Sequence, residues 1–301
     1  MKKSILIFAI FILAACSTTA PSATTPTRTT TPPDPTLTPT ATTAPTSTST
    51  PAPSITPSPT PVPNGPCDNP LVPLATGNQW LYRATTDNGE FLYTLKALER
   101  SDSRNIAVIM EFIDQTRGDT VQERVVCQNG AIDNFPLFLM DMHLSDFLDK
   151  LFDTYHDKGV YAPGYAAFVE NNWELDWETD YLTEDRVSVK NPIGGPDLYL
   201  VESSPIHLSF QMDGSREGVN VPAGDFPQAI KVSHRFSMIV TLTLPTGGTG
   251  GSLILNTTQW YQPYVGLIRA QVDSAWVETG GQEFSAPFHS VVELVEFTPG
   301  Q

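Results

Sequence analysis

Polar and apolar residues alternate along most of the chain from residue 67 onward. In the longest run, residues 230–244, every second side chain from Ile230 to Leu244 is apolar except His234. Similar alternation covers 206–213, 268–276 and 284–294. A period of two is typical of antiparallel strands that pack one face and expose the other to water. The pattern therefore predicts a β-rich domain.

Further strands are predicted between clusters of turn residues. They fall at 79–86, 90–100, 105–114, 120–128, 174–189 and 253–262. Hairpin turns are predicted at Asp87-Asn88-Gly89, Gln128-Asn129-Gly130 and Asp213-Gly214. We interpret the glycine-rich segment 246–252 as a flexible hairpin loop. A phosphate-binding loop is excluded there because the Gly-Lys-Ser/Thr ending and a following helix are both missing.

One segment has the spacing of a helix instead. Its apolar residues recur at i, i+3, i+4, i+7 and i+8, and they are Leu144, Phe147, Leu148, Leu151 and Phe152. Ser145 can cap the start of this helix. Because long strands coil strongly in an open sheet, we expect a mainly β fold built on a single curved antiparallel sheet or half-barrel. The amphipathic helix is expected on its concave side, and a β-sandwich is the alternative.

The N-terminus carries an export signal. A basic start at residues 1–3 precedes a short apolar run at 4–13, and Leu-Ala-Ala stands just before Cys16. The apolar run is about half of the ~20 residues that a membrane-spanning helix requires. The order resembles the lipobox of bacterial lipoproteins, which implies removal of residues 1–15 and acylation of Cys16 by palmitate or similar chains. An ordinary signal peptide with a chance cysteine is the alternative.

A disordered stalk is predicted at residues 16–66. Positions 17–66 hold 18 Thr, 14 Pro and 6 Ser, no aromatic residue, and charge only at Arg28 and Asp34. This composition buries too little apolar surface to offset the entropy cost of folding. Proline favours an extended polyproline II chain at ~3.1 Å per residue. The stalk would hold the domain away from the bilayer, as a plain spacer or as an O-glycosylated segment.

The remaining residues, 67–301, are expected to form one β-rich globular domain, because no second linker interrupts them. Only Lys2, Lys3, Arg28 and Asp34 of the charged residues precede it, so its net charge is about −18, against −16 for the chain. This charge argues against nucleic acid and against a domain lying flat on anionic lipid. The expected partners are a membrane, through the anchor, and an unknown protein, glycan or lipid ligand.

Three cysteines bear on the anchor and on the fold. Cys16 is assigned to acylation, which leaves Cys67 and Cys127 as a pair in an oxidising compartment. A disulfide between them would close a loop of about 60 residues and stabilise the fold by roughly 4 kcal/mol. It would also fasten the domain at the point where the stalk ends. Two buried free thiols are the alternative.

Three blocks of sequence resemble uncharacterised bacterial surface lipoproteins. The blocks are Gly77-x-x-Trp80-x-Tyr82, then Val221-Pro222-Ala223-Gly224-x-Phe226, then Trp260-Tyr261-x-Pro263-x-Val265-Gly266-Leu267. The resemblance spans most of 71–301 but has no counterpart over 135–200. It implies a β domain of unknown function, similar in outline to the half-barrels of periplasmic lipoprotein carriers. It implies no catalytic residue.

An acidic row is the most unusual local feature. Read as a strand, residues 173–181 place Glu174, Asp176, Glu178 and Asp180 on one face, about 7 Å apart. Calcium would relieve their repulsion, although the residue that an EF-hand loop requires as glycine is Tyr181. A solvated edge strand explains the row equally well. The opposite face, with Trp173, Leu175, Trp177 and Tyr181, is interpreted as core rather than as a sugar platform.

Histidine and nucleophile patterns give little support to catalysis. His234 lies on the apolar side of its run, where it is either a satisfied core residue or part of a ligand cavity. No His-Glu-x-x-His, Gly-x-Ser-x-Gly or paired cysteine and histidine is present. The acidic row could supply a glycosidase pair, but one exposed strand does not make a cleft.

The sequence therefore favours a non-enzymatic lipoprotein, anchored to the cell membrane on its extracytoplasmic face, whose β domain binds a partner or acts as a scaffold. A carrier that holds an acyl chain in a half-barrel is the alternative, and a carbohydrate-active enzyme is a third. The interior distinguishes the first two. A carrier needs an open apolar cavity, whereas a scaffold should be filled with side chains.

Overall fold

The computed structural model describes residues 67–100, 107–135, 142–144, 154–184, 186–191, 198–200, 203–244, 247–286 and 288–300. Every described residue belongs to one compact unit within residues 51–301. The predicted signal, the anchor at Cys16 and the stalk lie outside the described residues. Among the described residues, no helix has the length and apolar composition to cross a bilayer.

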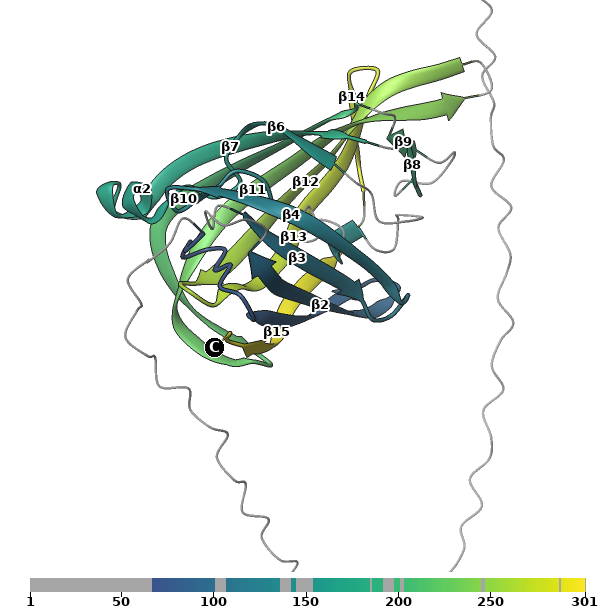
Figure 1. Ribbon diagram of the computed structural model, residues 1–301. Helices are drawn as coiled ribbons and strands as arrows, with labels where there is room; N and C mark the ends of the chain where they lie inside the picture. The colour runs from purple at the N-terminus through teal and green to yellow at the C-terminus, as the bar shows by residue number, and fades with distance from the viewer. Residues whose placement is uncertain are drawn as a thin grey trace, which may run out of the picture. The chain divides into compact units, whose positions relative to one another are not determined.

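Antiparallel strands form one curved sheet that does not close into a barrel (Figure 1). The strands before the middle of the domain are β1 (Gln79–Thr86), β2 (Gly89–Arg100), β3 (Ala107–Asp114), β4 (Asp119–Gln128), β5 (Ala131–Ile132), β6 (Thr154–Gly159), β7 (Glu174–Thr183), β8 (Val187–Val189) and β9 (Leu198–Leu200). The later strands are β10 (Pro205–Val221), β11 (Gly224–Leu244), β12 (Gly247–Gln262), β13 (Gly266–Thr279), β14 (Gln282–Ser285) and β15 (Ser290–Thr298).

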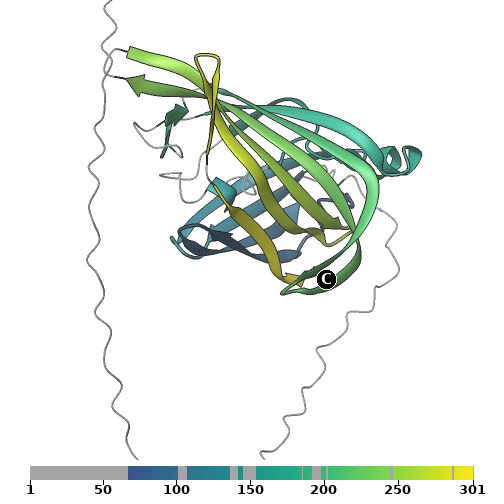
Figure 2. The same cartoon turned by 180° about the vertical axis from the view of Figure 1, so that it is seen from behind.

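The order of strands in the sheet follows their order in the chain in two runs, one from β1 to β5 and one from β6 to β15. The two runs meet where β1 pairs with β15. The order reads β5-β4-β3-β2-β1-β15-β13-β12-β11-β10-β7-β6, with β14 added to β13, and with β9 and β8 added to the far end of β11. The long strands β10 to β13 lie side by side and coil together, as Figure 2 shows from behind. The predicted single curved sheet is confirmed, and the two-sheet alternative does not form.

The glycine-rich segment is a strand and not the predicted loop. Gly247 to Gly251 continue β12 and pair in register with Leu244 to Val240 of β11. Glycine weakens a strand because it loses much conformational freedom on folding, but it keeps both hydrogen-bonding groups of the backbone. The ladder of β11 therefore outweighs the low strand propensity of this segment.

Two other predicted boundaries were wrong for the same kind of reason. Asp213-Gly214 does not separate two strands, because β10 runs through it with a bulge between Met212 and Arg216, where Gly214 takes a φ of 73°. The predicted strand 174–189 is divided, since β7 pairs with β10 only up to Leu182 opposite Pro205. Beyond that point β8 pairs with β9 instead.

The predicted amphipathic helix over 144–152 lies outside the described residues apart from Leu144, and residues 142–144 are helical. The described helix α2 (Tyr165–Glu170) was not predicted. It has six residues and buries one side chain, Phe168, so it is too short to show an apolar period. It stands between β6 and β7 in the chain and at the edge of the sheet in Figure 1.

The two end strands of the sheet are tied together at one point. Ile132 of β5 bridges Ala162, three residues beyond β6, and its amide donates to the Ala162 carbonyl at 2.8 Å. The buried Asn69 lies nearby: its amide group donates to the carbonyls of Gly130 and Pro163 at 2.8 and 2.7 Å. The sheet is thus held at one end by the segment that follows the predicted stalk.

A disulfide joins Cys67 to Cys127 at the same end of the sheet. Their Cα atoms are 5.1 Å apart, and both residues are buried. Cys127 belongs to β4 and pairs with Ile132 of β5. The disulfide that the number of cysteines predicts therefore links the start of the described domain to the strands at one end of the sheet.

Candidate functional site

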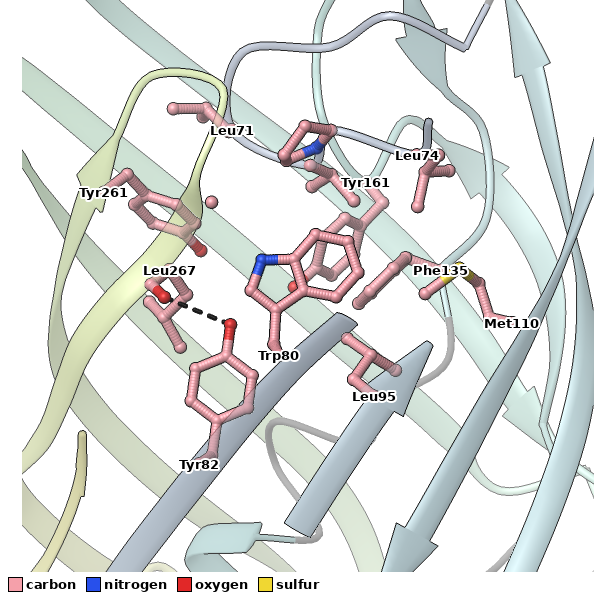
Figure 3. A pocket seen from close by; sticks show the side chains of 13 residues that line it. Leu71, Leu74, Trp80, Tyr82, Leu95, Met110, Phe135, Tyr161, Tyr261 and Leu267 are labelled. Atoms are coloured by element: carbon pink, nitrogen blue, oxygen red, sulfur yellow. Dashed lines mark hydrogen bonds between the residues drawn. The ribbon is translucent and has the colours of Figure 1, made fainter. Parts of the chain in front are cut away.

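The inner face of the sheet surrounds a small apolar space (Figure 3). It is lined by residues of β1, β2, β3, β12 and β13 and of the segments around them, among them Leu71, Leu74, Trp80, Tyr82, Leu95, Met110, Phe135, Tyr161, Tyr261 and Leu267. The space measures about 30 Å³, room for one or two water molecules. Trp80 stands near its centre in Figure 3, with the other labelled side chains arranged around the indole.

Two hydrogen bonds hold the wall of this space. The Trp80 indole Nε1 donates to the Val265 carbonyl at 2.5 Å. The Tyr82 hydroxyl donates to the Leu267 carbonyl at 3.1 Å, as the dashed line in Figure 3 shows. Between these carbonyls, Gly266 has a φ of 98°, and a Cβ there would meet the Trp80 indole at 3.5 Å. The first and third blocks of the lipoprotein resemblance are therefore in contact. Packing between the two blocks explains why Trp80, Tyr82 and Gly266 occupy these positions.

The second block forms the turn between β10 and β11. Pro222 and Ala223 make the turn, and the Ala223 amide donates to the Leu294 carbonyl of β15 at 3.1 Å. Gly224 has a φ of 138°, which favours a residue without a Cβ. This block also serves the fold, so none of the three blocks assembles a set of catalytic groups.

His234 is buried on the inner face of β11, as its place in the alternating pattern predicts. Its Nδ1 lies 3.0 Å from the Thr257 hydroxyl, and its ring centroid lies 4.5 Å from that of Phe210. No hydrogen-bond partner for its Nε2 is present in the described part of the chain. Burial, with a smaller contribution from His143, lowers the pKa of His234 to about 3, so the imidazole is neutral.

His143 is a second buried imidazole on the inner side of the sheet. Its Nδ1 lies 2.9 Å from the Ser290 hydroxyl of β15, and its Nε2 has no partner among the described residues. Burial lowers the pKa of His143 to about 4. No sequence pattern connects His143 with His234, because the two lie 91 positions apart and only the fold brings the two imidazoles close enough to interact.

A short polar chain continues from His234 along β12. The Tyr261 hydroxyl donates to Gln259 at 2.7 Å, and the Gln259 amide lies 3.3 Å from the His234 Nδ1. Burial raises the pKa of Tyr261 above its ordinary range, so the phenol keeps its proton. Thr257 and Gln259 could have been found from the sequence, since they interrupt the apolar positions of β12. These hydrogen bonds satisfy buried polar groups of the four side chains, and none of the four is an activated nucleophile.

The acidic row lies on the outer face of β7 as predicted, and its carboxylates do not converge. Asp180 pairs with the imidazole of His207 at 2.7 Å and with Lys158 at 3.1 Å. Burial raises the pKa of Asp180, but the hydrogen bonds from His207 and Lys158 outweigh it and lower that pKa. Glu174, Asp176 and Glu178 are exposed, and no cluster of three or more metal-binding side chains occurs in the part of the domain that the structure describes. The calcium site remains a prediction.

The aromatic row opposite it belongs to the core. Trp177 stacks on Phe210 with ring centroids 4.9 Å apart, and Trp173 stacks on Phe168 at 5.2 Å. The guanidinium of Arg216 covers Trp173 at 4.7 Å. With neighbours on its rings, this row offers no open platform for a sugar.

No model of a known protein family matches this chain, and no curated protein sequence is significantly similar to it. Two solved structures are similar to this chain. A candidate exported protein with a YmcC-like fold from Bacteroides fragilis matches 75% of this chain and 97% of its own, at 14% identity and a TM-score of 0.44. A candidate lipoprotein from Parabacteroides distasonis matches 78% and 100%, at 15% identity and a TM-score of 0.48.

Proposed function

We propose that this protein is a lipid-anchored display protein of the bacterial envelope whose β domain is a non-enzymatic binding module or scaffold. The anchor would be Cys16 and the spacer residues 16–66. The domain would then stand on the extracytoplasmic side, at a distance set by the stalk.

The observation that carries the proposal for the domain is the close packing of the described residues around Trp80. The apolar space around Trp80 measures about 30 Å³, whereas ligand pockets for drug-sized molecules measure about 300–1,000 Å³. An acyl chain would have to displace residues such as Leu95 and Met110, which are buried in contact with this space. This close packing of the described residues therefore supports a scaffold over an acyl-chain carrier.

The chemistry of the polar groups points in the same direction. The buried His234 and His143 face hydroxyl partners, and no described nucleophile is paired with a base and a third orienting group. The carboxylates of β7 all project from one strand on the exposed outer face, so no two of them face each other across an enclosed cleft of the kind in which a glycosidase holds its acid pair. These arrangements support the hypothesis that the domain is not an enzyme.

Native mass spectrometry of the full-length chain, extracted in a mild detergent, tests the close packing around Trp80. We expect the mass of the processed protein with its covalent acyl groups and no additional lipid, because the space around Trp80 cannot accept one. A bound phospholipid that survives removal of the detergent would contradict the scaffold proposal and support the carrier.

A further inference from the structure

A hollow next to the acidic row lies on the outer face of the sheet. We call it the outer hollow. It crosses β7, β10, β11, β12 and β13 and offers about 520 Å³, much more than the inner space. One wall is a row of paired residues, Glu178, Ser209, Arg235 and Asn256. The other wall is the row Asp176, Gln211 and Ser233, about 7 Å away along the strands.

The floor of the outer hollow is backbone. The row between its two walls consists of Trp177, Phe210, His234 and Thr257, which also line it. Their side chains point to the opposite face, because successive residues of a strand alternate and Phe210, His234 and Thr257 are buried there. They can therefore line the hollow only with main-chain atoms. The short side chains of Ser209 and Ser233 keep the trough open.

The walls carry hydrogen-bonding groups that the domain itself does not use. Within the described part of the domain, no hydrogen bond or ion pair engages the side chains of Asp176, Ser209, Gln211 and Ser233. Arg235 lies over the Trp276 ring at 5.2 Å, which fixes its guanidinium plane while its N–H groups remain free to donate. The trough thus presents donors and acceptors in rows across adjacent strands.

Negative charge stands at both ends of the trough. Asp176 and Glu178 occupy the β7 end, and Asp273 of β13 occupies the other. A bulge in β13 turns Asp273 outward, where it accepts from Thr258 at 2.6 Å and from Gln271 at 3.0 Å. Five strands at about 4.8 Å spacing give a length of roughly 19 Å between these ends.

We propose that the outer hollow binds a linear oligosaccharide that carries amino groups. Hydroxyl groups of a sugar chain would match the serine, glutamine, asparagine and arginine side chains along the trough, and ammonium groups would meet the carboxylates at its ends. The proposal deepens the proposed function, since it names the ligand class of the displayed domain. It also gives the acidic row of β7 a role without a metal ion.

A sugar chain fits this trough better than a peptide does. The walls provide no apolar pocket for an anchoring side chain, and the flat floor has no unpaired strand edge for a peptide to join, because its strands are paired on both sides. A cationic peptide would be attracted by charge alone, so it serves as the competing outcome of the test.

Isothermal titration calorimetry of the full-length protein in detergent tests the proposal, with glucosamine tetrasaccharide, its N-acetylated form and tetralysine as probes. We expect saturable binding of the glucosamine tetrasaccharide that weakens as salt is raised. The double variant Asp176→Asn with Glu178→Gln should weaken it about tenfold, because it removes two surface charge pairs. Ser233→Trp, which fills the trough from an exposed position, should abolish it.

The matched control is Glu278→Gln with Glu283→Gln, two exposed carboxylates that face each other on β13 and β14 outside the hollow. This control should bind like the unmodified protein. Failure of both saccharides to bind at millimolar concentration, or binding that Ser233→Trp leaves unchanged, would overturn the proposal. Equal binding of tetralysine would show charge attraction only and would also overturn it. Each result leaves the lipid anchor to be judged separately by acylation.

Discussion

Lowering the pH from 7.5 to 4 should reduce the free energy of unfolding by about 3 kcal/mol through each of the two buried histidines. Burial lowers the pKa of His143 to about 4 and that of His234 to about 3. In the unfolded chain the pKa of each imidazole returns to about 6.5. Below pH 6.5 the unfolded state therefore binds protons at these two histidines that the folded state does not bind.

The direction of this effect follows from the depressed values. The contribution to stability is fully present above about pH 6.5 and is lost progressively as the pH falls toward 4 and 3. The loss levels off only when the folded histidines themselves take up protons. Together the two groups represent on the order of 6 kcal/mol at pH 4, a large part of the 5–15 kcal/mol that stabilises an ordinary domain.

Urea unfolding of the full-length protein at several pH values measures this loss. His234→Gln, whose amide can still bond to Thr257, should flatten the decline between pH 6.5 and 4 by about half. Thr257→Val is the matched control: it removes the same hydrogen bond without removing the titrating group, so the protein should be less stable at every pH with an unchanged slope. A stability that is constant across this range would contradict the buried neutral imidazoles.

Removal of the Cys67–Cys127 disulfide should lower the free energy of unfolding by roughly 4 kcal/mol. The bond closes a loop with a sequence separation of 60, and it joins the start of the domain to the β4 and β5 end of the sheet. Without it, the unfolded chain gains the entropy of that loop. For a domain of this size, the midpoint of thermal unfolding should fall by about 8–16 °C.

Thermal unfolding with and without reductant, and of the Cys67→Ser variant, measures the effect. Reductant should lower the midpoint of the unmodified protein and leave that of Cys67→Ser unchanged. Pulling a single molecule from its two termini gives a second readout. The oxidised protein should extend by about 200 Å less, because 60 residues stay within the closed loop. Equal midpoints and equal lengths would show that the bond does not form.

The type of fold follows from the sequence because one period dominates it. The strand predicted at 79–86 has the bounds of β1, and the alternation at 230–244 lies within β11. Burial of one face fixes which residues point inward, so His234 could be placed on the inner face from its position alone. The apolar spacing that predicts a helix at 144–152 falls on residues outside the described part of the chain.

Strand ends and cross-strand features could not be predicted in the same way. Gly247 to Gly251 and Asp213-Gly214 have local turn propensity, and only the ladders with β11 and β7 keep them within strands. The outer hollow depends on strand register. Ser209 lies beside Arg235 and Glu178 because β10 pairs with β11 and β7, and this order of strands cannot be predicted from the sequence. The same holds for His143, which meets Ser290 only across the sheet.

Acylation of Cys16 is the most direct test of the account, because the display of the domain depends on it. Cells that express the full-length protein would be labelled with radioactive palmitate and separated into membrane and soluble fractions. We expect label on the protein, and loss of both label and membrane attachment in Cys16→Ser. An unlabelled protein, with Cys16→Ser held at the membrane as firmly as the original, would contradict it.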